Sequence, residues 1–192
     1  MSRQHTSFVL GYHGCERQIG EKIIAGEDNL VISKKNHDWL GHGAYFWEGD
    51  PKRALEWAND RKERGKIYEP FILGAVIDLG NCLDATTRDG AAIIETAHQS
   101  LQAKLEAGRY STLPENTKDG RHYLDCMVIE EAHLIATDGN LPPFETVRAL
   151  FPEGVPLFPN ASFWTKTHIQ IAVCNRANIK GFFRAPSVED LL

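Results

Sequence analysis

The sequence predicts a single mixed α+β domain. Segments typical of strands lie near both ends of the 192-residue chain, and segments with helical periodicity lie between them. That order favours a mostly antiparallel sheet over the alternating βαβ units that build parallel ones. A chain of this length, with 42% hydrophobic and 24% charged residues, is typical of one soluble globular domain. Residues 1–192 are therefore expected to share one core.

Four stretches predict extended structure. Residues 7–14 (SFVLGYHG) are short, apolar and rich in strand formers. Residues 70–80 (PFILGAVIDLG) are almost continuously apolar, as expected of a strand that is buried on both faces. Residues 165–174 (TKTHIQIAVC) alternate between an isoleucine-rich face and a more polar face. A short extended piece is expected around residues 182–183.

Start and stop signals define the helical segments between the strands. Asp50 followed by Pro51 is an N-cap carboxylate with proline at the first helical position. Gly26 and Gly108 follow segments with helical periodicity and predict their ends. The predicted helices are residues 15–25, a helix from Pro51, 89–107, 124–136 (where a strand is the alternative) and 144–150. Residues 111–120 and 153–160 are predicted loops.

Charge, cysteines and hydropathy exclude several classes of protein. The net charge of −5 gives no reason to expect non-specific binding to phosphate backbones, although a local basic face is compatible with it. The chain has no CxxC pair and no Cys/His cluster at zinc spacing, so no structural metal is expected. No stretch is long and apolar enough for a signal peptide or a membrane span. We therefore expect a cytoplasmic protein with reduced thiols and no membrane partner.

Three short stretches combine residues that can carry chemistry. In GYHGC, His13 lies between glycines at the end of the first strand, and Gly14 would let a planar amide approach the backbone. In LGHGAYFWEGD, Gly43 comes two residues before Tyr45, whose ring can stack on a flat ligand. Gln170 is an uncharged polar residue in an apolar strand. Each feature alone is also explained by a turn, a bulged strand or a half-exposed sheet position.

Together and in this order, the three stretches resemble the ADP-ribosyltransferases of the diphtheria-toxin and poly-ADP-ribose-polymerase type. The signature of that family is His-Tyr-Glu, with the glutamate sometimes replaced. YHG, GxYF and D-P-x-x-A-x-x-W-A are more similar to small bacterial members than to eukaryotic polymerases. The similarity covers residues 8–60 well and 165–174 moderately, and residues 85–160 form a helical and loop region that does not align. The resemblance implies split, mostly antiparallel sheets with flanking helices and an NAD cleft between the halves, with NAD as co-substrate and no metal.

The resemblance also carries a role to each matching position. It implies that His13 bonds a ribose hydroxyl of NAD and that main-chain groups of Gly14 pair with the nicotinamide carboxamide. Tyr45 would stack on the nicotinamide ring, for which Gly43 leaves room. Gln170 occupies the position of the glutamate, which in the family bonds the nicotinamide ribose. The catalytic residues implied in this way are His13, Tyr45 and Gln170.

Other contacts to NAD are less specific. The polymerases place a second ring on the nicotinamide, and Phe46, Trp47, Tyr12 or Tyr68 could supply it here. Ser33 is expected to bond the distal ribose, although a serine before two lysines is also ordinary loop chemistry. The cations that could meet the pyrophosphate, and that are otherwise expected to be solvated surface charges, are Lys34, Lys35 and Arg53.

Glutamine in place of glutamate changes the chemistry. A carboxylate stabilises positive charge on the ribose and can help activate the acceptor, whereas Gln170 has no charge and cannot act as a base. Acceptor activation could come from Glu48, Glu130 or Glu131, the last two of which are otherwise expected on a solvated helix face. His168 shares the predicted face of Gln170 and is a further candidate for a base or an orienting group. The alternatives are an acceptor that needs little activation and NAD binding without transfer.

We therefore expect transfer of single ADP-ribose units from NAD to a macromolecule, with release of nicotinamide. The charge balance mildly favours a protein acceptor over nucleic acid. An intracellular toxin or anti-phage effector, with a cognate antitoxin as partner, would suit such an enzyme. Two alternatives are a pseudoenzyme that binds NAD or ADP-ribose and a tRNA 2′-phosphotransferase, which shares the fold and uses NAD. The second alternative needs several basic residues around the phosphate, which the net charge of −5 disfavours.

Overall fold

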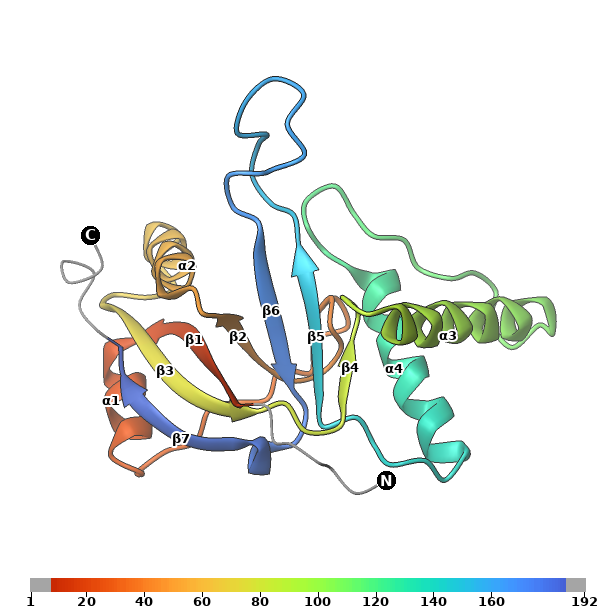
Figure 1. Cartoon of the computed structure of the whole chain (residues 1–192), viewed down its shortest axis with the longest axis horizontal. Helices are drawn as coiled ribbons and strands as arrows, with labels where there is room; N and C mark the ends of the chain where they lie inside the picture. The colour runs from red at the N-terminus through yellow and green to blue at the C-terminus, as the bar shows by residue number, and fades with distance from the viewer. Residues whose placement is uncertain (1–7, 186–192) are drawn as a thin grey trace.

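The computed structural model describes residues 8–185 (Figure 1). This part of the chain contains seven strands, four α-helices and one short 3₁₀ helix. In chain order the elements are β1 (Phe8–Glu16), α1 (Arg17–Ile24), β2 (Ala44–Glu48), α2 (Pro51–Glu63), β3 (Pro70–Asp78), β4 (Cys82–Asp84), α3 (Arg88–Glu106), α4 (Tyr123–Asp138), β5 (Thr146–Phe151), β6 (His168–Val173), η1 (Arg176–Asn178) and β7 (Ile179–Arg184).

The strands form one sheet in the order β4-β5-β6-β2-β1-β3-β7, and every neighbouring pair except β4–β5 is antiparallel. The predicted mixed α+β fold with a mostly antiparallel sheet is therefore confirmed. The implied division into two sheets is wrong, because all seven strands belong to one sheet, which is narrow where β1 meets β2. β1 pairs with β3 along its whole length, but with β2 only at Gly11–Glu48 and Tyr12–Trp47. Figure 1 shows β1, β3 and β7 running across the view while β5 and β6 stand nearly upright.

Local signals place the helix ends. The side chain of Asp50 accepts a hydrogen bond from the main-chain N–H of Arg53 at 2.9 Å, which caps the first turn of α2. Gly26 and Gly108 adopt φ angles of +76° and +72° just after α1 and α3. Within residues 8–185, no helix combines the length and the apolar character needed to cross a bilayer.

Most of the predicted elements are confirmed, and two are corrected. Residues 144–150, predicted as a helix, contribute instead to strand β5, because pairing on both sides with β4 and β6 overrides a periodicity too short to decide. The helix predicted over residues 15–25 begins at Arg17, because Cys15 and Glu16 still pair with β3. The predictions confirmed are the strands over 7–14 (residue 7 lies outside the described residues), 70–80 and 165–174, the extended piece at 182–183, and the helices over 89–107 and 124–136.

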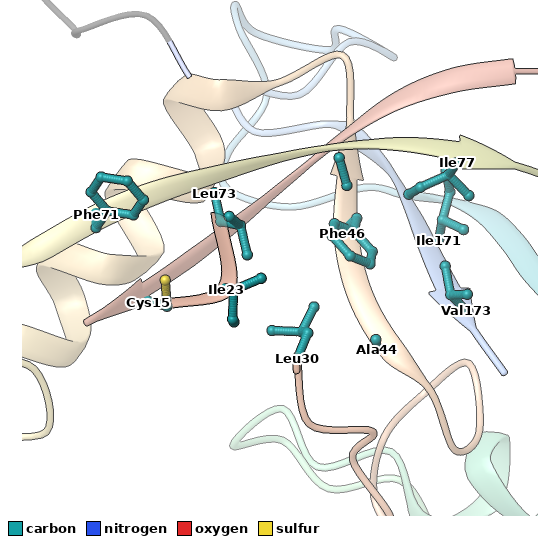
Figure 2. Packing of buried hydrophobic residues seen from close by; sticks show 11 residues of the cluster. Cys15, Ile23, Leu30, Ala44, Phe46, Phe71, Leu73, Ile77, Ile171 and Val173 are labelled. Carbon is teal, nitrogen blue, oxygen red and sulfur yellow. The ribbon is translucent and has the colours of Figure 1, made fainter. Parts of the chain in front are cut away.

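Apolar clusters cover both faces of the sheet. On the face of α1, one cluster joins β1, β2, β3 and β6, with Phe46 fully buried among Leu73, Ile171 and their neighbours (Figure 2). On the opposite face, one cluster lies beneath α2 and another lies beneath α3 and α4. Since side chains alternate along a strand, the burial of Phe46 fixes Tyr45 and Trp47 on the α2 face.

Candidate functional site

The candidate site lies where β1 and β2 diverge, and the side chain of His13 spans this gap. His13 Nδ1 lies 2.8 Å from the main-chain oxygen of Tyr45. Because a carbonyl oxygen only accepts, Nδ1 carries the proton and Nε2 presents a lone pair in the neutral ring. Burial lowers the pKa of His13, and the Tyr45 carbonyl opposes this effect only in part. The half-buried ring is therefore a fixed acceptor at neutral pH.

Gly14 is the buried residue that follows His13 in β1. Along an antiparallel strand, alternate residues direct their N–H and C=O groups to opposite neighbours. Leu10 faces β2, since its carbonyl accepts from the N–H of Gly49 at 2.9 Å. Gly14 faces the same side by this alternation, and the register of β1 with β2 has already ended at Tyr12. Its N–H and C=O are thus directed to the gap, where a planar amide could pair with both.

The absence of a side chain at Gly14 has a separate structural cause. A Cβ atom there would collide with the main-chain oxygen of Ala54 and would lie 3.2 Å from both Ala58 and the Trp57 ring, all in α2. Glycine is therefore required at this position for α2 to pack closely against β1. The glycine predicted to admit a ligand is needed for the fold whether or not a ligand binds.

Tyr45 is held by the turn that precedes β2. Its hydroxyl donates to the carbonyl of Gly41 and accepts from the N–H of Leu40, both at 2.9 Å. Burial raises the pKa of Tyr45, so its hydroxyl stays protonated. A Cβ at Gly43 would lie 2.9 Å from the Cβ of Ala172, so this glycine admits the neighbouring strand β6. The turn fixes the Tyr45 ring through its hydroxyl.

Ser33 is brought next to this turn by a pair of main-chain hydrogen bonds. Its N–H donates to the carbonyl of Gly43 at 2.9 Å, and its carbonyl accepts from the N–H of Gly43 at 3.1 Å. The structure therefore places Ser33 beside Gly43, two residues before Tyr45. Lys34 and Lys35, the adjacent cations, are both exposed.

Gln170 is oriented by a residue that the sequence did not connect to it. The indole N–H of Trp39 donates to Gln170 Oε1 at 2.6 Å, so this bond engages the amide oxygen and not the amide NH₂ of Gln170. Gln170 lies between Trp47 of β2 and Ala149 of β5 in the sheet. Trp39 and Ala149 also line a cavity of about 500 Å³ between the sheet, α3 and α4. The cavity therefore reaches two neighbours of Gln170, although Gln170 itself does not line it.

The carboxylates proposed to activate an acceptor are already engaged. Glu48 binds Arg148 at 2.6 Å, and Glu130 accepts from the main-chain N–H of His42 at 2.8 Å and lies 3.0 Å from its ring. Glu131, expected on a solvated face, is only 4% exposed and binds Lys104 at 2.6 Å between α3 and α4. That expectation is wrong for Glu131, because α3 covers this side of α4.

The aromatic residues around the gap differ from those predicted. Phe46, expected to contact NAD, is fully buried in the cluster of Figure 2, where it packs against the His13 ring at 5.9 Å and offers no face to a ligand. Tyr68 is 81% exposed. Trp57 was not predicted, yet its half-buried ring lies 6.3 Å from His13 and 6.0 Å from Trp47. The D-P-x-x-A-x-x-W-A motif could have predicted this position of Trp57. Helical spacing places Ala54, Trp57 and Ala58 on the same face of α2, the face that packs against β1.

Arg53 and His168 are buried on the same face. Arg53, expected to be a solvated cation, is only 8% exposed and makes a bidentate pair with Glu153 at 2.7–3.0 Å. The expectation is wrong because Glu153, one hundred positions away, provides a partner that lets the guanidinium be buried. His168 Nδ1 lies 2.7 Å from the carbonyl of Lys166. Both residues adjoin Trp47, with Arg53 over its ring.

The described residues offer no built metal centre: within 8–185, no three His, Cys, Asp or Glu side chains are grouped to hold an ion. The residues around the gap instead offer the His13 imidazole as an acceptor, the main-chain groups of Gly14, the rings of Trp47 and Trp57, and the Gln170 amide held by Trp39. Such groups can recognise a planar amide and the hydroxyl groups of a sugar.

Comparison with known proteins adds one relative. A protein of Methanocaldococcus jannaschii, described as uncharacterized, is 25% identical over 188 residues, which cover 88% of this chain and 83% of that protein. No family model matches the chain, and no solved structure gives a significant match. The similarity therefore extends over most of both sequences.

Proposed function

We propose that the chain is an NAD-dependent mono-ADP-ribosyltransferase, which transfers one ADP-ribose to a macromolecular acceptor and releases nicotinamide. The observation that carries the proposal is the His13–Tyr45 hydrogen bond across the β1–β2 gap. This bond fixes the imidazole next to the main chain of Gly14, with the Trp57 ring 6.3 Å away. A nicotinamide riboside needs these groups: main-chain partners for the carboxamide, a ring to stack on, and acceptors or donors for the ribose hydroxyls.

The proposed reaction requires the site to break the glycosidic C–N bond between nicotinamide and ribose. When the glycosidic C–N bond breaks, its electron pair returns to the nicotinamide nitrogen, and positive charge develops on the ribose. The His13 lone pair would accept from one ribose hydroxyl, and the Gln170 amide would donate to another. These contacts hold the ribose while the bond breaks, which favours a dissociative path with little help from the nucleophile. The acceptor then bonds to the ribose carbon and loses its proton.

A protein acceptor is favoured by the loop between β5 and β6. In Figure 1 this loop projects beyond the sheet. Its exposed apolar side chains are Val155, Leu157, Phe158, Phe163 and Trp164. Exposed apolar residues grouped on one loop are typical of protein contacts, and the net charge of −5 disfavours a polyanion. We therefore propose a protein acceptor.

The test is release of nicotinamide from NAD, measured by chromatography. We expect His13→Ala and Tyr45→Ala each to lower the rate about 10- to 100-fold, because each removes a ligand contact and an anchor of the gap. Tyr68→Ala is the matched control, since the Tyr68 ring is 81% exposed. Equal rates for all three variants would contradict the proposed site.

A second function is favoured by the Trp39–Gln170 bond and by the engaged carboxylates. A site that has the Gln170 amide, held by Trp39, in place of a carboxylate could bind NAD or ADP-ribose without cleaving NAD. NAD binding by calorimetry, together with no nicotinamide release over a long incubation, would establish this function. Transfer of a 2′-phosphate from tRNA to NAD in the same preparation would instead indicate a tRNA 2′-phosphotransferase.

A further inference from the structure

Three buried polar atoms on the α2 face have no hydrogen-bond partner among the described residues. They are Trp47 Nε1, Arg53 Nη1 and His168 Nε2. The three residues come from β2, α2 and β6, and each is more than nine-tenths buried. Unpaired buried polar atoms cost free energy, so a water molecule or a polar group of a ligand is expected to bind beside these three.

The three side chains form one cluster. The Arg53 guanidinium carbon lies 5.4 Å from the centre of the Trp47 ring, and the Trp47 and His168 rings are 6.2 Å apart. Glu153 links Arg53 and His168, because its carboxylate lies 2.7 Å from Arg53 Nη2 and 3.8 Å from His168 Nδ1. The cluster lies beside Gln170, because His168 is two residues from it on the same face of β6, a separation of about 7 Å.

The donors and acceptors of the cluster define what would complete it. His168 Nδ1 donates to the carbonyl of Lys166, so Nε2 is a bare lone pair in the neutral ring. Burial lowers the pKa of His168, and the nearby charge of Arg53 lowers it further, while Glu153 and Asp50 oppose this effect. Trp47 and Arg53 each offer an N–H. A hydroxyl group has the capacity that these atoms need, since its oxygen accepts two hydrogen bonds and its O–H donates one.

A hydroxyl fits this cluster better than an anion does. The charge of Arg53 is already balanced by its bidentate pair with Glu153. An anion would also meet the lone pair of His168 Nε2 and repel it. A neutral O–H group avoids both penalties.

We propose that His168 is the general base of the transferase and that the acceptor atom is a hydroxyl oxygen, with the N–H groups of Trp47 and Arg53 stabilising the charge that develops on it. This inference rests on the proposed ADP-ribosyl transfer and supplies the base that Gln170 cannot provide. In the step, the C–N bond breaks first, with its electron pair on nicotinamide. The hydroxyl oxygen then bonds to the ribose carbon while its proton moves to His168 Nε2, and the imidazolium releases that proton to solvent.

The experiment compares two nucleophiles with the full-length chain and NAD. Methanol carries a proton that must be removed, whereas azide is already an anion, and each product is measured by mass spectrometry. We expect His168→Gln to lower methyl ADP-riboside formation about 100-fold and to change azide transfer less than about threefold. Trp47→Phe keeps the ring and removes one N–H, and we expect it to lower methanol transfer about tenfold with azide transfer unchanged.

The outcomes separate this inference from the proposed function. If the unmodified chain releases no nicotinamide with water, methanol or azide, the transferase itself is wrong, and the base with it. If the chain turns over and both variants lose methanol and azide transfer equally, the cluster supports the fold around a buried water and His168 is not the base. Azide transfer also shows whether each variant is folded, because an unfolded chain would transfer neither nucleophile. Loss of methanol transfer alone therefore supports His168 as the base.

Discussion

The two faces of the sheet at the β1–β2 junction differ in what they bury. The face of α1 buries aliphatic and aromatic side chains around Phe46 (Figure 2). The face of α2 buries polar groups as well, among them Arg53 and His168, and the Gln170 amide lies half-buried beside them. An apolar cluster is satisfied by packing alone, whereas buried polar groups need partners. One face therefore holds the strands together by packing, and the other is the face on which we propose that the ligand binds.

The largest effect is expected from truncation on the apolar face. Phe46→Ala should lower the free energy of unfolding by about 3–5 kcal/mol, because it leaves a cavity where β2 meets β1, β3 and β6. Urea denaturation followed by fluorescence measures this change. Leu150→Ala on β5 is the control, since its side chain is already half in solvent. Similar losses for both variants would mean that Phe46 does not anchor the junction.

Gly14→Ala probes the boundary between the two faces, and a smaller effect is expected. The added Cβ meets the main-chain oxygen of Ala54, so the free energy of unfolding should fall by about 1–3 kcal/mol as α2 is displaced. Gly181→Ala in β7 is the control, because a Cβ there meets open space. If Gly14→Ala keeps full stability and only raises the KM for NAD, the glycine serves the ligand and not the helix.

These residues also show what the sequence could and could not predict. The cap at Asp50 and the stops at Gly26 and Gly108 depend on neighbours a few positions away, so the pattern located them. The bond between Trp39 and Gln170 joins positions 131 apart, and it depends on how the sheet folds. For the same reason Arg53 was expected in solvent, although its partner Glu153 buries it.

A third prediction concerns the polar face alone. Gln170→Glu should keep the hydrogen bond from Trp39, because a carboxylate oxygen accepts as an amide oxygen does. The new charge should stabilise the ribose cation and raise the kcat of nicotinamide release about tenfold. Gln170→Leu is the matched control and should lower kcat. A loss of the same size in both variants would show that the amide NH₂, and not the missing charge, limits the reaction.

The smallest expected effect is a change in how stability depends on pH. Burial lowers the pKa values of His13, His133 and His168 below 6.5, the ordinary value of a histidine in the unfolded chain. As the pH falls through 6.5 the unfolded chain takes up protons first, so the free energy of unfolding falls, by at most about 1.4 kcal/mol per pH unit for each histidine. His168→Gln removes one of these contributions and should flatten the decline between pH 7.5 and 5.5. Urea denaturation at a series of pH values measures both slopes, and identical slopes would mean that His168 titrates in the folded protein as it does in the unfolded chain, contrary to its burial on the polar face.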